Sequence, residues 1–515
     1  MSSTVFAVAV CLPKSGDCSN APVFPSRPEG EPDEGLGYFV SRLAVSSFWC
    51  YTLHAQKKDL QVNVVKLQKE ELFTNRMLLR LIFPLVIEQA LAALVGMCDG
   101  VMVSSAGEAA ISGVSLVDMI NNVIINLFAA LATGGAVITS QFLGARRREE
   151  AQRSAGQLVC MAAVFGLGVM AFCLFLAQGM LRLFFGSIEA DVMAAGLTYF
   201  RITALSFPFL AMYNAGAALF RASGNSRLPM TVSILSNIIN IIGNAILIFG
   251  LKMGVLGAAI PTLLGRVFCA VVILYKLRQP HQKIIVHDYR AIRPDFKRIG
   301  HILRIGVPTG VENSMFQFGK LVIQSTVSTL GTAAIAANAM AAMVEGFVGN
   351  ASVGVGLGLM TVVGQCMGAG HVEEARRYIL KLSFLGRMLI LLFCAMAAVL
   401  IQPVTVIAGM EPDAALMTVQ MVWLICAYKP LMWSTSFMLA YGMRAAGDVK
   451  FSLITSSVTM WTCRVIITVV LIRVFHMGPV AVWIGMFSDW TARSIAYVWR
   501  FRSGRWAQHQ VIEKA

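Results

Sequence analysis

Long apolar segments separated by short polar loops dominate the chain from residue 77 onward. An α-helix rises about 1.5 Å per residue, so about 20 apolar residues cross the roughly 30 Å hydrocarbon core of a membrane. The second and eighth of these segments are long and rich in glycine, so we expect those helices to tilt or bend. The pattern predicts twelve membrane-spanning helices, at 77–101, 113–142, 155–179, 191–215, 228–250, 253–277, 299–325, 334–366, 379–402, 414–441, 450–472 and 479–501.

One long segment occurs twice. Residues 84–153 align on residues 308–377 without a gap when they are shifted by 224 positions. The similarity continues into the fourth and fifth predicted helices, where Arg221-Ala-Ser-Gly-Asn225 is echoed by Arg444-Ala-Ala-Gly-Asp448. A repeat of this length predicts two equivalent structural units. The identical pairs include polar and conformationally special residues: Pro84 and Pro308, Glu88 and Glu312, Gly107 and Gly331, Asn126 and Asn350, Gly134 and Gly358, Gln141 and Gln365.

The repeat and the spans together define the expected architecture. We predict an all-α integral membrane protein whose twelve transmembrane helices form two pseudo-symmetric six-helix lobes around a central cavity. Corresponding helices share one orientation, so the pseudo-two-fold axis runs along the membrane normal. The predicted units are an N-lobe at 76–277, a charged linker at 278–298, a C-lobe at 299–505 and a C-terminal tail at 506–515.

Residues 1–75 differ from the rest of the chain. The part between Cys11 and Gly37 is rich in proline, glycine and acidic residues, a composition that cannot bury enough apolar surface to fold alone. A basic n-region and a small-residue cleavage site, which mark a signal peptide, are missing. We expect this N-terminal extension to be disordered or to reflect a mis-assigned start codon. Residues 60–71 are expected to form an amphipathic helix on the membrane surface.

Composition supports the membrane assignment, because hydrophobic residues make up 57% and charged residues 13% of the chain, against about a quarter charged in soluble proteins. The net charge of +15 would suggest a nucleic-acid partner for a soluble protein. Here lysine and arginine gather in alternate loops, so orientation explains them and no nucleic-acid partner is expected. Both termini are therefore predicted on the cytoplasmic side of the inner membrane. The basic loops contain Arg146 to Arg148, Arg221 and Arg227, Lys276 to Arg304, Arg376 and Arg377, Arg444 and Lys450, and Arg500 to Arg505.

Cysteine and histidine patterns do not indicate a metal site. The eleven cysteines form no C-x-x-C motif, and most of them lie inside apolar segments, where a free cysteine behaves as a small buried hydrophobe. The seven histidines fall in loops, at the ends of apolar segments or in the tails. We expect no transition metal, no cofactor and no enzymatic activity.

Acidic residues inside a membrane are functional hypotheses by default, because a buried charge there is costly. Glu88 and Asp99 are eleven positions apart, about three helical turns, so they share one face of the first helix. Pro84 precedes Glu88 by one turn and cannot donate its backbone hydrogen bond, which permits a kink in that helix. A purely structural pair of carboxylates, satisfied by neighbouring polar side chains, explains these positions equally well.

The fifth and sixth helices favour a binding site. Asn237, Asn240 and Asn244 form an N-x-x-N-x-x-x-N pattern, and Thr262 follows in the next helix. Oxygen ligands from one carboxylate, amides and a hydroxyl suit a small hard cation, or a proton held with water. In the second half the equivalent positions are Ile323 for Asp99, Cys463 or Arg464 for Asn240, Ile467 or Thr468 for Asn244, and Gly485 or Met486 for Thr262. A polar cluster present in only one of two duplicated lobes is more consistent with a site than with shared scaffold.

These motifs resemble the multidrug and toxic compound extrusion (MATE) family. The resemblance covers roughly residues 70–505 and rests on the order of its motifs: Pro84-x14-Asp99-Gly-Val-Met-Val, Gly-x5-Gln141-x2-Gly144-Ala, the Arg221 loop, Asn240-x3-Asn244-x4-Phe249-Gly250 and Gly-x-x-Gly-Ala-Ala-x-x-Thr262. It implies a twelve-helix antiporter that exports amphipathic, often cationic drugs or metabolites in exchange for Na⁺ or H⁺.

The resemblance also assigns residues. It implies that Asp99, Asn240, Asn244 and Thr262 form a first-lobe cation site, and that Pro84 bends the first helix. The family commonly has Asp where this chain has Asn244, so one negative charge is missing from the site.

Three further acids, Glu88, Glu312 and Glu345, are candidates for a proton or substrate path, although Glu88 and Glu312 are repeat partners and a structural role competes equally. Asp489 and Arg493 are four residues apart on the last helix, where we expect them to neutralise each other. Arg266 occupies the repeat position of Asp489 and is expected to approach that pair.

The partners that we expect are a small amphipathic substrate and the lipid bilayer, and the protein is expected to be a monomer. A lipid-linked oligosaccharide or lipid flippase of similar architecture is the alternative function. A flippase would need a basic cavity for a pyrophosphate headgroup, and the sequence suggests only Arg266, Arg464 and Lys429 in or near the spans.

Overall fold

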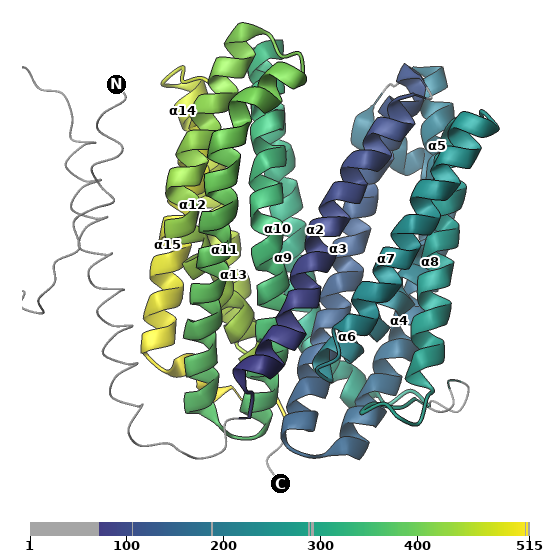
Figure 1. The fold of residues 1–515 in the computed structure, drawn as a ribbon, viewed down its shortest axis with the longest axis vertical. Helices are drawn as coiled ribbons and strands as arrows, with labels where there is room; N and C mark the ends of the chain where they lie inside the picture. Colours follow the sequence, from purple (N-terminus) through teal and green to yellow (C-terminus); the bar gives the residue numbers. More distant parts are fainter. Residues whose placement is uncertain are drawn as a thin grey trace, which may run out of the picture. The chain divides into compact units, whose positions relative to one another are not determined.

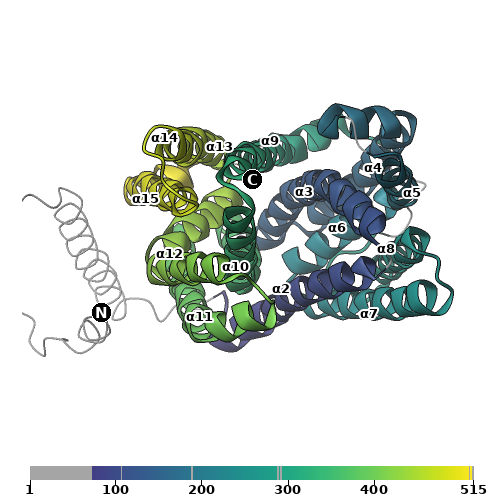
Figure 2. The ribbon, with the colours of Figure 1, turned by 90° about the horizontal axis from the view of Figure 1, so that it is seen from above.

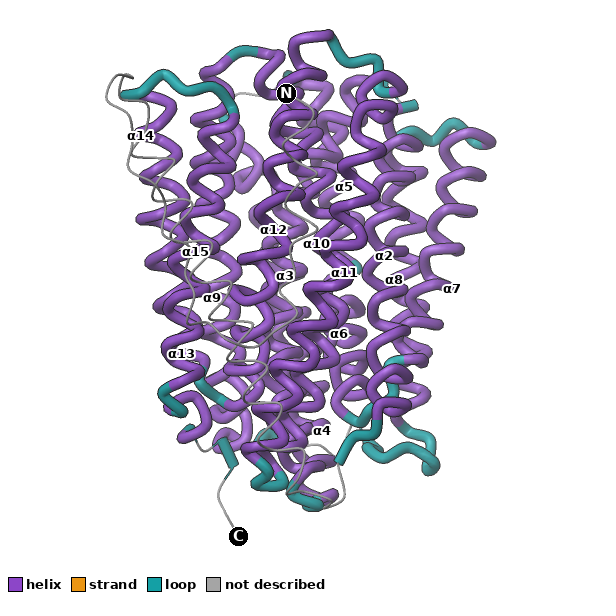
Figure 3. Tube along the Cα trace, turned by 60° about the vertical axis from the view of Figure 1, so that its left-hand side comes forward, coloured by secondary structure: helices purple, strands orange, loops and turns teal. Residues whose placement is uncertain are grey.

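The computed structural model describes residues 72–512 apart from 106, 187–188, 287–288, 290–292 and 510. Within this part the chain is helical, without a strand, and a helical segment stands at each of the twelve predicted spans (Figure 3). The predicted fold class is therefore confirmed. Nine spans are single helices: α2 (Asn75–Ser104), α3 (Glu108–Gly144), α4 (Arg148–Phe185), α8 (Val255–Leu277), α9 (Phe296–Val327), α10 (Thr332–Gly368), α11 (Val372–Ile407), α12 (Pro412–Ala446) and α15 (Val480–Arg502).

Three spans are composite. The fourth consists of α5 (Ala190–Leu205) and α6 (Phe207–Ala222), which meet at Ser206 with a bend of 47°. The fifth continues from α7 (Arg227–Asn244) into a π-helix, η2 (Ala245–Gly250). The eleventh consists of α13 (Val449–Thr459), the π-helix η4 (Met460–Ile466) and α14 (Ile467–Arg473). Short 3₁₀ turns, η3 (Ser328–Leu330) and η5 (Arg505–Gln508), follow α9 and α15.

The long second and eighth spans are uninterrupted helices. α3 and α10 have 37 residues each, which corresponds to about 55 Å, so both extend beyond a membrane of roughly 30 Å. Their glycines allow close packing rather than a break. At Gly354 of α10, for example, an added Cβ would lie 2.8 Å from the backbone of Leu85 on α2.

By length and composition, nine helices of the described part are apolar enough to cross a membrane, or ten when α5 and α6 count as one span. The two remaining spans, α9 and α15, are too polar by this measure. Both carry ionisable residues in mid-helix, including Glu312 on α9 and the pair Asp489 and Arg493 on α15. These three side chains are buried within the bundle, so their polar groups face protein rather than lipid.

The helices form two groups, α2 to α8 and α9 to α15, which Figures 1 and 2 show side by side. We call the first group the N-lobe and the second the C-lobe. The lobes meet through a reciprocal exchange, in which α2 packs against α10 and α3 packs against α9. This exchange follows from the repeat, because α2 corresponds to α9 and α3 to α10.

The lobes make their closest contact where α3 and α10 end, at the end of the bundle that carries the arginine-rich loops; we call it the basic end. An added Cβ on Gly144 would lie 2.0 Å from the backbone oxygen of Gln365, and one on Gly368 would lie 1.9 Å from that of Gln141. The two glutamine side chains cross the interface: Gln141 Nε2 donates to the Ala445 carbonyl (2.8 Å) and Gln365 Nε2 to the Ala222 carbonyl (2.7 Å). The paired contacts give the interface its two-fold character.

The segments that flank the lobes dock on them. Phe73, just before α2, is 5% exposed, and its carbonyl accepts a hydrogen bond from Tyr378 on α11 (2.8 Å). The last residues of the predicted N-terminal extension therefore belong to the helical body, whereas residues 1–71, including the predicted surface helix at 60–71, lie outside the described residues. The linker docks on Arg148 at the start of α4, which donates to the carbonyls of Gln282 (2.8 Å) and Lys283 (2.9 Å).

Candidate cation site and central cavity

Four polar residues from three helices of the N-lobe form one hydrogen-bonded cluster. Asn244 Nδ2 lies 3.0 Å from Asp99 Oδ1 and 3.3 Å from Asn240 Oδ1. Asn240 Nδ2 lies 3.1 Å from the Thr262 hydroxyl, which itself donates to the carbonyl of Ala258 (2.9 Å). The structure thus brings together the four residues that the sequence comparison selected, and their role in binding a cation stays a prediction. We call Asp99, Asn240, Asn244 and Thr262 the N-lobe site.

The local sequence explains how these helices converge. α7 ends at Asn244 and passes into the π-helix η2, and π-helical turns often occur at functional sites. Gly243 packs against Pro261 of α8, so closely that an added Cβ would lie 2.7 Å from the proline ring. This contact sets Asn240 and Asn244 beside Thr262.

The Asn240 amide can satisfy the Asp99 carboxylate. Turned so that its nitrogen faces Asp99, it donates to Oδ1 (2.8 Å) and Oδ2 (3.1 Å), and its oxygen accepts from Thr262 (3.1 Å). Asn244 Oδ1, on a side chain that is 2% exposed, has no hydrogen-bond donor among the described residues. The cluster therefore offers oxygen ligands that a small cation could use.

A second polar cluster lies next to this site. Asn121 Nδ2 donates to Asp118 Oδ1 (3.3 Å), and Asp118 also interacts with Tyr199 and Arg266. Arg266 Nη1 donates to the Ser206 hydroxyl at the α5–α6 bend (2.7 Å). The expectation that Arg266 approaches Asp489 is wrong, because the two residues hold equivalent positions in opposite lobes. Tyr199 had no sequence signal that linked it to Asp118.

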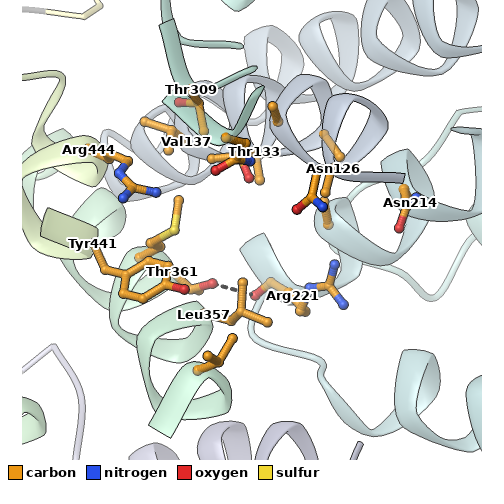
Figure 4. A pocket seen from close by; sticks show the side chains of 18 of the residues that line it. Asn126, Thr133, Val137, Asn214, Arg221, Thr309, Leu357, Thr361, Tyr441 and Arg444 are labelled. Atoms are coloured by element: carbon orange, nitrogen blue, oxygen red, sulfur yellow. Dashed lines mark hydrogen bonds between the residues drawn. The ribbon is translucent and has the colours of Figure 1, made fainter. Parts of the chain in front are cut away.

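A central cavity of about 420 Å³ lies between the lobes, toward the basic end. Polar groups from both lobes line it, including Asn126, Asn214, Thr309 and Thr361 (Figure 4). The Thr361 hydroxyl donates to the Arg221 carbonyl (3.2 Å), one of the contacts that join the lobes at this level. The predicted cavity between the lobes is therefore present.

Two repeat-related ion pairs border the cavity. Arg221 Nη1 lies 3.6 Å from Glu88 Oε1 in the N-lobe, and Arg444 Nη2 lies 3.2 Å from Glu312 Oε1 in the C-lobe. Glu312 also accepts from the Ser452 hydroxyl (3.3 Å). Both arginines were predicted in basic loops and the pairs were not predicted, although the matching R-A-x-G motifs were an available signal. Each lobe contains an equivalent pair, which favours a structural role for Glu88 and Glu312. A proton path through these residues stays a prediction.

The third predicted path residue, Glu345, lies in the C-lobe, where its Oε1 is 2.5 Å from Lys429 Nζ. Asp489 and Arg493 form the predicted pair at 2.9 Å. The sequence-based count of three cations in or near the spans is too low, because Arg387 of α11, which donates to the Thr435 hydroxyl (2.9 Å), and the buried Arg493 of α15 also lie within the spans. Pro84 lies inside an unbroken α2, and its role as a kink stays a prediction.

A family model described as MatE matches residues 84–246 and 308–470, two segments offset by 224 positions, which is the register of the repeat. The probable multidrug resistance protein NorM of Thermotoga maritima is 27% identical over 460 residues, which cover 87% of this chain and 97% of the relative. The uncharacterized transporter YisQ of Bacillus subtilis is 24% identical over 443 residues, covering 84% and 95%. A crystal structure of MATE in complex with MaL6 superimposes with a TM-score of 0.79 at 21% identity, covering 84% of this chain and 97% of that one.

Two pseudo-symmetric helical lobes around a polar cavity are the architecture of a secondary membrane transporter. The family model covers more than half of the chain, so the chain belongs to the MatE family. It is an efflux transporter of the MATE type, as the resemblance predicted, and the flippase alternative is not favoured. Members of this family are transporters, which is consistent with the expectation of no enzymatic activity.

Proposed function

We propose that the protein is a cation-coupled antiporter that exports amphipathic compounds by alternating access. The observation that carries the proposal is the N-lobe site, where Asp99 lies among amide and hydroxyl groups of α7 and α8. Na⁺ or H⁺ is the coupling ion. Drugs or metabolites with a cationic group are the cargo that the family resemblance predicts.

The hydrogen bonds of the N-lobe site support a coupling mechanism. Asp99 of α2 accepts from Asn244 of α7 (3.0 Å), and an ion bound at this carboxylate would compete with that bond. Asn244 Oδ1, which has no donor among the described residues, would be a second oxygen ligand for the ion. Loading and release of the ion would thus change the hydrogen bonds that tie α2 to α7. An ion that binds two conformations with different affinity shifts the balance between them.

The contacts between the lobes suggest which conformation this is. Gln141 and Gln365 join the lobes at the basic end, and the central cavity ends against this layer. If the arginine-rich loops are cytoplasmic, as positive charge in short loops indicates, the cytoplasmic side is closed. Both termini then lie in the cytoplasm of a cell whose inner membrane holds the transporter, and cargo leaves toward the outside.

The central cavity is the proposed resting place of the cargo. It lies between lobes that must rock against each other, and its volume of about 420 Å³ is within the range of small-molecule sites, about 300–1,000 Å³. Glu88 and Asp99 lie on the same helix, about 16 Å apart along its axis. A change at Asp99 can therefore reach the cavity through a single rigid element, α2.

Efflux from proteoliposomes tests the proposal. Vesicles loaded with a cationic dye should lose it when an inward Na⁺ or H⁺ gradient is imposed, and Asp99→Asn should slow this efflux at least tenfold, since an amide carries no charge to bind the ion. Asp191→Asn, at the exposed start of α5, is the matched control and should transport like the wild type. Thermal unfolding of the variants in detergent checks that they fold. Wild-type efflux rates in Asp99→Asn under the same gradient would refute coupling at the N-lobe site.

A further inference from the structure

The interior of the C-lobe holds a cluster of ionisable side chains that the coupling mechanism does not use. Its members come from five helical elements of the C-lobe. The basic members are Lys320 on α9, Lys429 on α12, Arg464 on η4 and Arg493 on α15, and the acidic members are Glu345 on α10 and Asp489 on α15.

Each carboxylate of this cluster already has a close basic partner. Lys429 Nζ lies 2.5 Å from Glu345 Oε1, and the lysine side chain is fully buried. Arg493 Nη2 lies 2.9 Å from Asp489 Oδ1, whereas Arg464 Nη1 is 4.0 Å from Asp489 Oδ2. Arg464 and Lys320 are therefore in excess over the carboxylates of the cluster.

Arg464 is poorly satisfied where it lies. Its Nη2 is 2.6 Å from the sulfur of Met486, and a thioether is a weak acceptor. Its Nε is buried and has no hydrogen-bond partner among the described residues. The ring of Phe316 lies 5.9 Å from the Arg464 guanidinium and 4.7 Å from that of Arg493, and a ring face attracts a cation without neutralising it.

Lys320 is the other basic side chain in excess. Glu312, Phe316 and Lys320 follow each other at four-residue intervals on α9, so they share one side of the helix. Phe316, one turn before Lys320, has its ring 5.9 Å from the Arg464 guanidinium, so Lys320 stands on the side of α9 that faces Arg464, with which it interacts electrostatically. The Lys320 side chain is exposed. Among the described residues, Lys320 forms no hydrogen bond and no ion pair. Because its charged neighbours lie inside the lobe, Lys320 is the member of the cluster that an incoming molecule meets.

The repeat makes positions of this cluster equivalent to positions of the N-lobe site. A shift of 224 positions carries Asn240 to Arg464, Thr262 to Met486 and Asp99 to Ile323. The hydrogen bond between Asn240 and Thr262 thus has the contact between Arg464 and Met486 as its counterpart. Where the N-lobe presents a carboxylate for a cation, the C-lobe presents a guanidinium.

We propose that the C-lobe cluster binds the acidic group of an amphipathic substrate, a carboxylate, sulfonate or phosphate, between Lys320 and Arg464. Unmatched charges within a membrane-spanning lobe are unfavourable, and an anionic group of the substrate supplies the missing counter-charge. The inference rests on the proposed export function and adds to it a preference for amphiphiles that carry an acidic group, alone or together with a cationic one.

Buried aromatic rings pack behind the basic side chains of the cluster. Lys429 lies 5.5 Å from the ring of Trp433 and 6.0 Å from that of Trp490, and these two rings are 5% and 1% exposed. The partly exposed ring of Phe316, 5.9 Å from the Arg464 guanidinium, is the aromatic surface of the cluster that an aromatic organic acid can reach.

A pair of dyes that differ in one group provides the test. Rhodamine B carries a free carboxylate and is a zwitterion near neutral pH, and its ethyl ester has the same ring system with a net positive charge. Fluorescence anisotropy measures the binding of both dyes to the purified full-length protein in a neutral detergent without added anionic lipid. We expect the wild type to bind the acid more tightly than the ester.

Lys320→Gln should lower the ratio of acid to ester affinity about tenfold, which corresponds to about 1.4 kcal/mol, and Lys320→Arg, which keeps the charge, should largely restore the ratio. Lys252→Gln removes a positive charge from an exposed loop of the N-lobe and should leave the ratio at the wild-type value. Equal or tighter binding of the ester by the wild type, or equal loss of both dyes in Lys320→Gln, would overturn the inference. Binding is measured without an ion gradient, so the dye affinities can be interpreted even if ion-coupled export fails.

Discussion

The paired glutamines at the basic end make a quantitative prediction about the balance between conformations. Gln141 and Gln365 each donate across the lobe interface to a carbonyl at the end of a helix, at 2.8 and 2.7 Å. An intramolecular hydrogen bond of this kind contributes about 0.5–1.5 kcal/mol net. Replacing both glutamines by alanine should therefore destabilise the state closed at the basic end by about 2 kcal/mol relative to the open one, roughly a 30-fold change in their ratio.

The opening can be followed with a cysteine at Asn126, which lines the central cavity. A membrane-impermeant maleimide added at the basic end reacts with this cysteine when the lobes separate there, and the parent chain without the substitution gives the background. We expect labelling about 30-fold faster in the double variant and about fivefold faster in each single variant, because the two bonds are related by the repeat.

Gln402→Ala is the matched control, since Gln402 is exposed on α11. It should label at the parent rate. An unchanged labelling rate in the double variant would show that the glutamine bonds do not hold the lobes together. That result would refute the interpretation of the basic end as a latch.

Two further predictions concern the ion pair of the C-lobe and the missing charge of the N-lobe site. Glu312→Gln leaves Arg444 without its charged partner at 3.2 Å, so thermal unfolding in detergent should show that the free energy of unfolding falls by about 3 kcal/mol. Adding Arg444→Met should recover most of this loss. A single variant as stable as the wild type would contradict a structural role of the pair. Asn244 Nδ2 lies 3.0 Å from Asp99 Oδ1, so Asn244→Asp puts a second carboxylate beside Asp99. The cation concentration for half-maximal dye efflux should then fall about tenfold, whereas Asn237→Asp on the same helix should leave it unchanged. Equal effects of the two variants would count against a cation at this site.

The repeat explains how much of the fold could be predicted from the sequence. A gapless register of polar and glycine residues predicted two like lobes, and it anticipates contacts such as Gly144 with Gln365 and Gly368 with Gln141. The composition of the spans predicted their number but not their breaks. α5 and α6 meet at Ser206, two residues before Pro208, whereas the C-lobe counterpart stays helical through Pro430.

The two sites differ in how far sequence reasoning could reach. The N-lobe site was predictable because Asp99, Asn240, Asn244 and Thr262 lack counterparts in the other lobe, so a comparison within the chain singled them out. The ion pairs of Glu88 and Glu312 were not predicted because their arginines stand near the end of a helix. Arginines at such positions are first explained by the orientation of the protein in the membrane.

The C-lobe cluster could not be predicted from the sequence, for a geometric reason. Its members come from five elements far apart in the chain, and only packing brings Lys320 and Arg464 into one cluster. Hydropathy counts such residues as interruptions of a span, without regard to the direction of the side chain. The distances between α9, η4 and α15 were needed to recognise them as one group.

Counterflow measured in one vesicle population tests the central claim most directly. Efflux of a dye from proteoliposomes should be accompanied by movement of Na⁺ or H⁺ in the opposite direction, recorded with an ion indicator inside the vesicles, and Asp99→Asn should abolish both fluxes together. Dye efflux by the wild type without any opposing cation flux, or a dye-dependent cation flux that persists in Asp99→Asn, would contradict the claim that Asp99 couples export to a cation.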